Sequence, residues 1–495
     1  MKLKDILDGI PTIHFHGTEK AEVMGIAYSS ESIHRDYLFA ALKGEKRDGF
    51  DFIPSAVAKG AIAILSERPV PSDFDLNWIE VQDARQSLAL CSANFYSHPS
   101  RHLNVVGITG TKGKTTISYI LESILKQSGF SPGIIGTISY RGPGLNMTAE
   151  RTTPEAPDLQ RMMKALVDQN ATHCLMEVSS HSLELDRVVG IDFDVTVFTN
   201  LSGEHLDYHQ TMERYFEAKK KLFFLNQKKR MAVINTDDLW GQKLTKELHM
   251  GVISFGFNPQ AMMRAEEFAS SDKGIEMTIQ YPAGKMKIFS PLLGRPNAYN
   301  ILAAVAVALT LNVPESRISE GISSLQGVPG RFEKIRNSLG LHIIVDYAHN
   351  DDALRNLLET TKELAPQKVI LVFGAGGDRD RSKRPRMGEV AGRLADFTII
   401  TSDNPRSEDP LAIISDIERG MKKSRHVHYE IEADRRKAIE RALWIARPDD
   451  YILVAGKGHE SYQIIGDRVI PFNDAEIVRE LLDKKKGKSN WLNFI

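Results

Sequence analysis

The chain has 495 residues, of which 42% are hydrophobic and 26% charged, and its formal net charge at pH 7 is −1. This length exceeds a single hydrophobic core, so the composition predicts a soluble globular protein of about three domains. The near-zero net charge excludes nucleic acid or an anionic membrane as a default partner. Two cysteines, Cys91 and Cys174, are too few for a disulfide framework.

The apolar segments of the chain are all short. None approaches the run of about 18 residues that a membrane span requires. The N-terminal segment MKLKDILDGI lacks the apolar region of a secretory signal. We therefore expect a cytoplasmic protein without a membrane span, acting as a monomer on small molecules and not on nucleic acid.

The first part of the chain, residues 1–98, mixes short strand-like segments with a helix-like segment. Three short apolar runs between residues 26 and 65 predict strands, and residues 52–60 predict a helix. The following segment, residues 96–103, contains a proline and is typical of a linker. We interpret residues 1–98 as the first domain.

The second part, residues 99–332, begins with an apolar strand at 103–109, a Gly-rich turn and an amphipathic helix. The apolar residues expected on one face of this helix are Ile117, Ile120, Leu121, Ile124 and Leu125. Two more apolar strands with polar ends follow at 173–180 and 195–202. Strands that alternate with helices predict a parallel sheet, whose ligands gather at the carboxyl ends of the strands.

The third part, residues 333–495, repeats one plan, an apolar strand followed by a Gly- or Asp-rich loop. The repeats are at 341–350, 368–380, 397–406 and 450–460. This pattern predicts a second doubly wound domain. The fold class is therefore α/β with three domains, of which the central domain and the last domain are each built on a parallel sheet.

The strongest motif is GTKGKTT, which lies between a predicted strand and a predicted helix. Its residues are Gly110, Thr111, Lys112, Gly113, Lys114, Thr115 and Thr116. The two glycines let backbone N–H groups face phosphate oxygens, and the helix N-terminus adds its dipole. Lys114 supplies a positive charge and Thr115 offers a hydroxyl to Mg²⁺. Although Ile108 replaces the first glycine of the common spacing, the motif predicts ATP and Mg²⁺ binding.

Two further residues at strand ends are candidate metal ligands. Glu177 ends the strand at 173–180, and His205 follows the next strand in the segment NLSGEHLDYH. Together with Thr115 they would supply the oxygen and imidazole ligands that a divalent ion accepts. From the residues alone, Lys219 in ERYFEAKKKLF is not distinguishable from neighbouring lysines on a solvated basic face.

Taken in order, the motifs resemble those of the Mur ligases of bacterial cell-wall synthesis. They are GTKGKTT, MEVSSH, NLSGEHLDYH with EAK, GRPNAYN, PGRFE, DYAHN and GKGHE, between about residues 25 and 475. The resemblance implies a UDP- and substrate-binding domain at 1–98, a central P-loop-type ATPase domain that binds ATP at 99–332 and a Rossmann-like amino-acid-binding domain at 333–495. It also implies that ATP phosphorylates a carboxylate, and that an amine then attacks the acyl phosphate to form an amide.

The resemblance also implies roles for individual residues in ATP chemistry. It marks Lys219 as a carbamylated lysine and a metal ligand. The implied catalytic residues are Lys114, Glu177, His205, Lys219 and His349. Asn297 and Asn300 resemble the asparagines on the adenine side of ATP, and Arg331, Asp346 and His349 resemble residues that close over ATP.

The implied substrates are UDP-N-acetylmuramoyl-L-alanyl-D-glutamate and meso-2,6-diaminopimelate. Contacts implied for the nucleotide precursor are Ser30, Thr152, Thr153, Ser179 and Arg187. Contacts implied for the amine are Arg379, Asp403, Asn404, Pro405, Arg406, Gly456 and Glu460. The physics agrees, because the Arg406 guanidinium can bind the distal carboxylate that diaminopimelate has and lysine lacks.

Some positions depart from the family pattern, and alternatives stay open. Ser29-Ser30-Glu31 stands where the family usually has Asp-Ser-Arg, and Leu185 stands where it often has glutamine. Arg406 could instead form a surface salt bridge with Glu408 or Asp409. The alternative functions are an L-lysine-adding relative, an amide ligase such as folylpolyglutamate synthase, and a non-catalytic nucleotide-binding paralogue.

Overall fold

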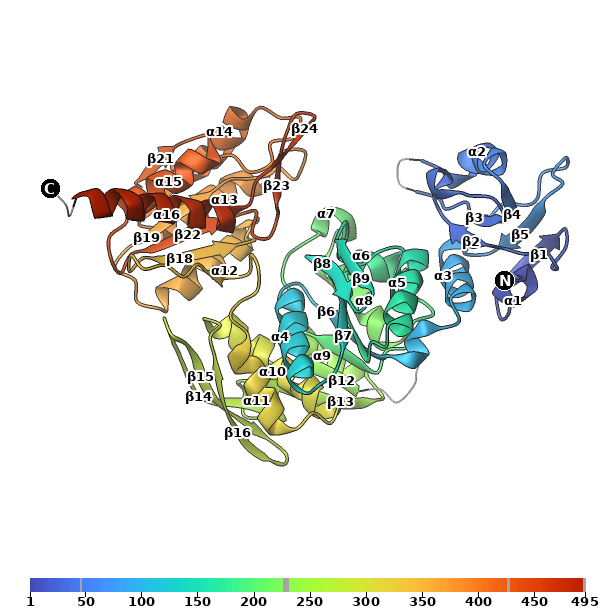
Figure 1. Cartoon of the computed structure of the whole chain (residues 1–495), viewed down its shortest axis with the longest axis horizontal. Coiled ribbons are helices and arrows are strands. Elements are labelled where there is room, and N and C mark those ends of the chain that lie inside the picture. The colour runs from blue at the N-terminus through green and yellow to red at the C-terminus, as the bar shows by residue number, and fades with distance from the viewer. Residues whose placement is uncertain (45–46, 226–230, 425–427, 493–495) are drawn as a thin grey trace. The chain divides into compact units, whose positions relative to one another are not determined.

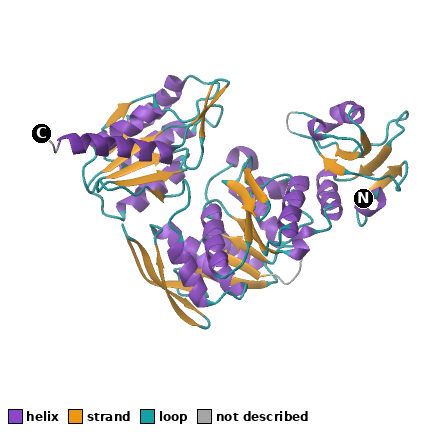
Figure 2. Cartoon of the chain, in the orientation of Figure 1, coloured by secondary structure: helices purple, strands orange, loops and turns teal. Residues whose placement is uncertain are grey.

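The computed structural model describes residues 1–44, 47–225, 231–424 and 428–492. It consists of two compact units, one formed by Met1–Arg264 with Leu302–Gly321 and the other by Ala265–Ile301 with Ile322–Ile495. Strands and flanking helices make up both units (Figures 1 and 2). This division does not test the domain boundaries at 98/99 and 332/333, which stay predictions. Among the described residues, no helix is long and apolar enough to cross a membrane.

The first sheet has the strand order β1-β5-β4-β3-β2, and only β1 runs antiparallel to its neighbour. Its elements are α1 (Leu3–Ile6), β1 (Thr12–His16), β2 (Gly25–Ala27), η1 (Ser30–Ser32), β3 (Tyr37–Ala40), η2 (Gly49–Phe52), α2 (Ile53–Ala58), β4 (Ala61–Ser66), β5 (Asn77–Val81) and α3 (Ala84–Phe95). The predicted strands and helix are confirmed. The expected linker contains a short 3-10 helix, η3 (Pro99–His102), whose first two residues are buried.

The second sheet has, within the described residues, 11 strands in the order β16-β15-β14-β13-β12-β11-β6-β10-β7-β8-β9. Its strands are β6 (Asn104–Thr109), β7 (Pro132–Ile135), β8 (Ser139–Gly142), β9 (Leu145–Thr148), β10 (His173–Glu177), β11 (Val195–Phe198), β12 (Met231–Asn235), β13 (Gly251–Gly256), β14 (Met263–Ser271), β15 (Gly274–Tyr281) and β16 (Gly284–Ser290). The helices of this region are α4 (Lys114–Gln127), α5 (Ala156–Asp168), α6 (Ser180–Glu184), α7 (Leu206–His209), α8 (Met212–Lys220), η4 (Lys221–Phe223), α9 (Leu239–Glu247), α10 (Arg295–Thr310) and α11 (Glu315–Ser324).

Strand β6 lies between β10 and β11 and runs parallel to both, so the predicted parallel sheet is confirmed. Glu177 at the end of β10 pairs with Ile108, and Phe198 at the end of β11 pairs with Thr109. The carboxyl ends of three neighbouring strands therefore meet where the GTKGKTT turn begins. The predicted apolar face of α4 is fully buried. The antiparallel strands β8, β9, β15 and β16 were not predicted.

The third sheet has the order β17-β18-β22-β19-β20-β21, parallel except for β17, and β23 and β24 form a separate hairpin. Its elements are β17 (Glu333–Lys334), β18 (His342–Asp346), α12 (Asp351–Lys362), β19 (Val369–Phe373), α13 (Lys383–Leu394), β20 (Phe397–Ile400), α14 (Pro410–Met421), β21 (Tyr429–Ile431), α15 (Arg435–Ile445), β22 (Tyr451–Ala455), β23 (Tyr462–Ile465), β24 (Arg468–Pro471) and α16 (Asp474–Leu492). Separate apolar clusters cover its two faces. The predicted doubly wound domain is confirmed.

Candidate active site

The GTKGKTT turn is held tightly against the end of β11. Gly110 has φ 139°, and a Cβ there would lie 1.9 Å from Thr199 Oγ1, so only glycine fits. The backbone N of Lys112 donates to Asn200 Oδ1 at 3.0 Å, and Thr199 Oγ1 donates to Lys112 O at 2.6 Å. These bonds fix the turn directly before the N-terminus of α4, the kind of position at which backbone N–H groups bind phosphate oxygens.

The cation and the hydroxyl of the turn are positioned by short hydrogen bonds. Lys114 Nζ donates to Gly110 O at 2.8 Å and to Thr111 O at 2.9 Å. Thr115 is buried at the start of α4, and its Oγ1 donates to Glu177 Oε2 at 2.9 Å. The structure therefore brings three predicted site residues, Lys114, Thr115 and Glu177, to one end of the sheet.

The Glu177 carboxylate is 1% exposed. Besides the Thr115 hydroxyl, it accepts hydrogen bonds from Thr137 N at 3.0 Å and Thr137 Oγ1 at 2.9 Å. A Cβ at Gly136 would lie 2.3 Å from Glu177 Oε1, so this glycine makes room for the carboxylate. Sequence reasoning missed Thr137. Its only signal is its position just after β7, the strand beside β10.

Lys219 differs sharply from the neighbouring lysines of α8. It is 1% exposed, and its Nζ donates to Gly110 O at 2.9 Å and lies 4.5 Å from the Tyr215 ring centroid. Burial, with the positive charge of Lys114 adding, holds the pKa of Lys219 well below its usual value. Lys220 instead pairs with Glu247 at 3.0 Å. The solvated-face interpretation is therefore wrong for Lys219.

His205 lies at the start of α7 with φ 57°. Burial lowers the pKa of His205 to about 4; Glu204 opposes this shift, and the charges of His181, Lys114 and Lys219 add to it. At neutral pH the imidazole is therefore uncharged and keeps a lone pair that can bind a metal.

A second histidine of the same segment also belongs to this environment. His209 stacks on Tyr215 with ring centroids 5.0 Å apart, and its Nε2 lies 2.9 Å from Ser180 Oγ. The Tyr215 hydroxyl lies 3.2 Å from Thr111 Oγ1. Tyr215 in α8 therefore contacts the GTKGKTT turn, and His209 in α7 packs against Tyr215.

The predicted metal ligands fit a hard cation only in part. Thr115 and Glu177 present oxygen donors, and His205 presents a neutral nitrogen. The Lys219 amine, if protonated, would repel a cation, and it fits only as a carboxylate-like derivative. Within the described residues, no group of three or more His, Cys, Asp or Glu side chains could hold a metal ion.

Four residues predicted to bind the nucleotide precursor form one network beside Glu177. Thr153 Oγ1 donates to Glu177 O at 2.8 Å and accepts from Ser179 N at 3.0 Å. Arg187 Nη1 donates to Thr153 O at 3.1 Å. Thr152 Oγ1 lies 3.1 Å from Thr137 Oγ1.

The remaining predicted precursor residue, Ser30, lies in η1 of the first sheet region. Its carbonyl accepts a hydrogen bond from Lys59 Nζ at 2.9 Å, and Ser29 caps η1 by accepting from Glu31 N. Sequence reasoning missed Tyr28, whose hydroxyl donates to Asp158 Oδ2 at 2.9 Å and so links this region to α5.

The other compact unit holds the predicted adenine-side asparagines. Asn297 and Asn300 are buried in the first turns of α10. Asn297 Nδ2 donates to Leu293 O at 2.8 Å, and Asn300 Nδ2 donates to Asn297 Oδ1 at 3.1 Å. The structure thus brings these two side chains into direct contact.

The three other residues predicted to bind the nucleotide gather around Tyr347. The Arg331 guanidinium lies 4.7 Å from the Tyr347 ring centroid, and His349 Nδ1 lies 2.8 Å from Tyr347 O. Asp346, at the end of β18, accepts from Phe332 N at 2.7 Å.

Three of the residues predicted to bind the amine, Asn404, Gly456 and Glu460, follow the ends of β20 and β22. Asn404 Nδ2 donates to Glu460 Oε2 at 2.8 Å. Fully buried Lys457, which sequence reasoning missed, donates to both, at 3.0 Å to Glu460 and 3.2 Å to Asn404 Oδ1. A Cβ at Gly456 would lie 2.5 Å from Asp403 Oδ2.

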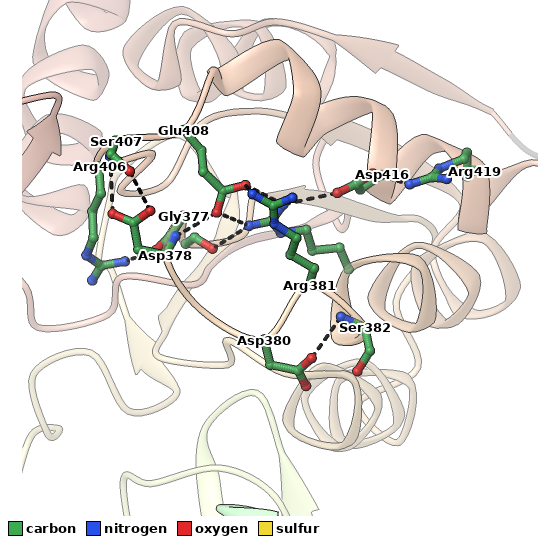
Figure 3. Close-up of polar contacts among 12 residues, drawn as sticks. Gly377, Asp378, Asp380, Arg381, Ser382, Arg406, Ser407, Glu408, Asp416 and Arg419 are labelled. Carbon is green, nitrogen blue, oxygen red and sulfur yellow. Dashed lines mark hydrogen bonds and ion pairs between the residues drawn. The ribbon is translucent and has the colours of Figure 1, made fainter. Parts of the chain in front are cut away.

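Arg406 follows directly, after Pro405, and has φ 53°. Its Nη1 donates to Gly377 O at 2.7 Å (Figure 3). Arg379, the second predicted cationic contact, is exposed in the loop after β19. Glu408 pairs with Arg384 and Arg381, and Asp409 caps α14, so both acids have other roles than pairing with Arg406.

Comparison with known proteins agrees with this geometry. Three family models match: "Mur ligase family, catalytic domain" over residues 22–96, "Mur ligase middle domain" over 108–308 and "Mur ligase, glutamate ligase domain" over 330–458. A UDP-N-acetylmuramoyl-L-alanyl-D-glutamate--2,6-diaminopimelate ligase of Alkaliphilus metalliredigens (strain QYMF) is 43% identical over 490 residues, which are 98% of each chain. The ligase of the same name from Geobacter metallireducens (strain ATCC 53774 / DSM 7210 / GS-15) is 44% identical over 511 residues, 98% of this chain and 100% of that one.

A solved structure of a UDP-N-acetylmuramoyl-L-alanyl-D-glutamate--2,6-diaminopimelate ligase superimposes with a TM-score of 0.72 at 32% identity, covering 98% of this chain and 99% of that one. The family models and the named relatives show an ATP-dependent ligase that forms a peptide bond, and the glycine-rich turn beside the buried Glu177 carboxylate is consistent with that class. The family models and the two relatives then decide the family: the chain belongs to the Mur ligases.

Proposed function

We propose that this chain adds meso-2,6-diaminopimelate to UDP-N-acetylmuramoyl-L-alanyl-D-glutamate in the synthesis of peptidoglycan precursors. The observation that carries the proposal is Arg406, which lies in the loop that also presents Asn404 beside Glu460 and whose guanidinium donates to Gly377 O of the neighbouring loop. The 43% and 44% identical relatives are named as 2,6-diaminopimelate ligases, which supports the same substrate.

In this proposal ATP binds at the Gly110–Thr116 turn. A carboxylate oxygen of the precursor attacks the γ-phosphorus and ADP leaves. The amine nitrogen then attacks the acyl carbon, phosphate leaves and a proton is lost. Lys114 offsets the negative charge that develops during phosphoryl transfer. Further nucleotide contacts are assigned by family resemblance to Asn297, Asn300, Arg331, Asp346 and His349.

Thr115, Glu177, His205 and Lys219 are proposed to hold Mg²⁺, which would neutralise phosphate charge. Lys219 can take part only after carbamylation, in which its neutral amine forms an N–C bond with CO₂ and a proton is lost. Its burial supports this step, because burial disfavours the ammonium form. The product is a carboxylate-like oxygen donor in place of a cation.

The precursor itself is proposed to bind at Thr152, Thr153, Ser179 and Arg187, with uridine at Ser30. Within the described residues, Arg187 Nε is buried without a hydrogen-bond partner, which supports a role in binding a substrate oxygen. Glu31 stands where the family usually has arginine, so we expect the uridine end to be held differently.

The amine is proposed to bind with its zwitterionic end at Gly456 and Glu460, where Asn404 donates to Glu460. Its distal carboxylate would then pair with Arg406, and Arg379 would add a second cation. Lysine lacks that carboxylate and would leave the Arg406 guanidinium without its anion. The site therefore favours diaminopimelate over lysine.

The test is a coupled phosphate-release assay with ATP, the dipeptide nucleotide precursor and one candidate amine at a time. We expect release to depend on the precursor and on meso-2,6-diaminopimelate. Faster release with lysine would indicate a lysine-adding enzyme, and release with a folate and glutamate would indicate a folylpolyglutamate synthase. Absence of release with every pair would indicate a non-catalytic paralogue.

A further inference from the structure

Two loops of the third sheet act as one structural element. The first amine loop (residues 374–382) follows β19, and the second amine loop (residues 401–409) follows the neighbouring parallel strand β20. Gly377 joins them twice, because its N donates to Asn404 O at 2.9 Å and its O accepts from Arg406 Nη1 at 2.7 Å. The position of the Arg406 guanidinium therefore depends on how the two loops are aligned.

Side chains from each loop also bind the backbone of the other. Asp378 of the first amine loop accepts from Ser407 Oγ at 2.6 Å and from Ser407 N at 3.2 Å. Glu408 of the second amine loop accepts from Asp378 N at 2.7 Å. Figure 3 shows this reciprocal arrangement, in which each loop supplies one carboxylate to the other. The hydrogen bonds from Ser407 lower the pKa of Asp378, which keeps its carboxylate charged.

A buried arginine outside both loops anchors this arrangement. Arg384, in α13, is 1% exposed, and its two terminal nitrogens bind the two oxygens of Glu408 at 2.8 and 3.0 Å. A third bond runs from Arg384 Nη1 to Asp416 Oδ2 at 3.0 Å. Hydrogen bonds from Arg384 are the main cause that lowers the pKa of Glu408 to about 2. Glu408 is thus fixed by α13 and in turn fixes the backbone of the first amine loop.

Backbone conformation shows why such an anchor is needed. Asp378 and Arg406 both have φ 53°, in the left-handed region that residues other than glycine rarely adopt. Such conformations persist only where surrounding contacts impose them. A buried ion pair contributes little net stability because both charges are desolvated, whereas its bidentate geometry fixes position well.

We propose that Arg384 and Glu408 are positioning residues for amine selection, which hold the two amine loops in the alignment that places Arg406 on the distal carboxylate of diaminopimelate. This inference rests on the proposed function. In this proposal neither residue contacts the substrate, and Glu408 acts on selectivity through Arg406.

The first experiment compares Glu408→Gln with wild type in the phosphate-release assay. We expect the KM for diaminopimelate to rise about tenfold, the effect of losing one charge-assisted contact. The KM for ATP and the slow turnover of lysine should not change, because neither uses the guanidinium. Asp416→Asn is the matched control, since it breaks the other ion pair of Arg384 and leaves both loops bonded. Its KM for diaminopimelate should stay within about twofold of wild type.

A double-mutant cycle separates positioning from general stability. In an Arg406→Ala background, Glu408→Gln should cause no further loss of diaminopimelate selectivity. Additive losses, or an equal rise in the KM for ATP, would overturn the inference. If Arg406→Ala alone left the preference for diaminopimelate unchanged, the proposed substrate would be wrong. If that variant lost the preference and Glu408→Gln kept it, only the positioning role would fail.

Ser407→Ala provides a variant that does not touch the buried arginine. It removes only the hydroxyl bond to Asp378 and keeps the Arg384–Glu408 pair. We expect a smaller rise, about threefold, in the KM for diaminopimelate with unchanged thermal stability. An unchanged KM in this folded variant would contradict the role of loop alignment, even if Glu408→Gln failed to fold.

Discussion

The phosphate turn and the amine loops both follow buried parallel strands, yet they position their cations by different means. Lys114 donates to the carbonyls of Gly110 and Thr111, four and three residues earlier in the chain. Arg406 donates to Gly377, which is 29 residues away, and its loop depends on the Arg384–Glu408 pair. A local motif therefore suffices to position one cation, whereas the other depends on two loops being aligned by the fold.

The largest expected effect concerns Lys114, the cation that its own motif positions. Lys114→Ala should lower amine-dependent phosphate release by about a thousandfold or more, because it removes the cation that the motif places next to the transferring phosphate. Thermal unfolding should be close to that of wild type. Lys126→Ala, at the other end of α4, is the control and should retain activity. Normal turnover of Lys114→Ala would refute the ATP-site assignment.

Gly136→Ala tests whether the Glu177 carboxylate must keep its position beside the turn. The added Cβ would lie 2.3 Å from Glu177 Oε1, so the carboxylate must shift. We expect kcat to fall by about a hundredfold, as misplacement of a catalytic group by about 1 Å can cause. Gly327→Ala is the matched control, because its Cβ would meet no atom within 4 Å. Equal activities of the two variants would argue against a role for Glu177 in the reaction.

Arg406→Ala tests the other cation, whose position depends on the alignment of two loops. Loss of a charge-assisted contact to a carboxylate costs about 1.5–3 kcal/mol, so the KM for diaminopimelate should rise at least about tenfold. The KM for ATP should stay near the wild-type value. Arg406→Lys keeps the charge and loses the planar guanidinium, so its KM for diaminopimelate should lie between those of wild type and Arg406→Ala. A change in the ATP value alone would disprove the specificity argument.

The smallest expected effect concerns the stability that Glu408 contributes and its dependence on pH. Hydrogen bonds from Arg384, with the Asp378 N–H and the Arg381 charge adding, lower the pKa of Glu408 from 4.5 to about 2, so these contacts add stability above pH 4.5 that is lost as pH falls through 2. We expect wild type to exceed Glu408→Gln by about 1–3 kcal/mol in free energy of unfolding at pH 6. Denaturant titrations should show this difference shrinking between pH 4.5 and 2. A difference that is independent of pH would mean that Glu408 does not act as a charged partner.

Much of the fold was predictable because strands buried on both faces appear as continuous apolar runs. The strands that became β6, β10, β11 and β22 were recognised in this way. The hairpin β8–β9 escaped because its strands are short, antiparallel and only partly buried. Strand β16 escaped because buried and exposed residues alternate along it and form no continuous apolar run. The expected linker at 96–103 is a packed turn, because Ser100 Oγ accepts from Asp192 N in the next region.

The sequence by itself determined the phosphate turn and its cation, since glycine freedom and a lysine next to a helix start act within a few residues. It also determined the amine loops as a motif. Only the tertiary structure distinguished Lys219 from Lys220, brought Thr137 to Glu177, and paired Arg384 with Glu408. The physical reason is that burial and ion pairing depend on which side chains meet in space. Arg384 and Glu408 are 24 residues apart and Thr137 and Glu177 are 40 residues apart, whereas Lys219 and Lys220 are adjacent residues that differ in burial.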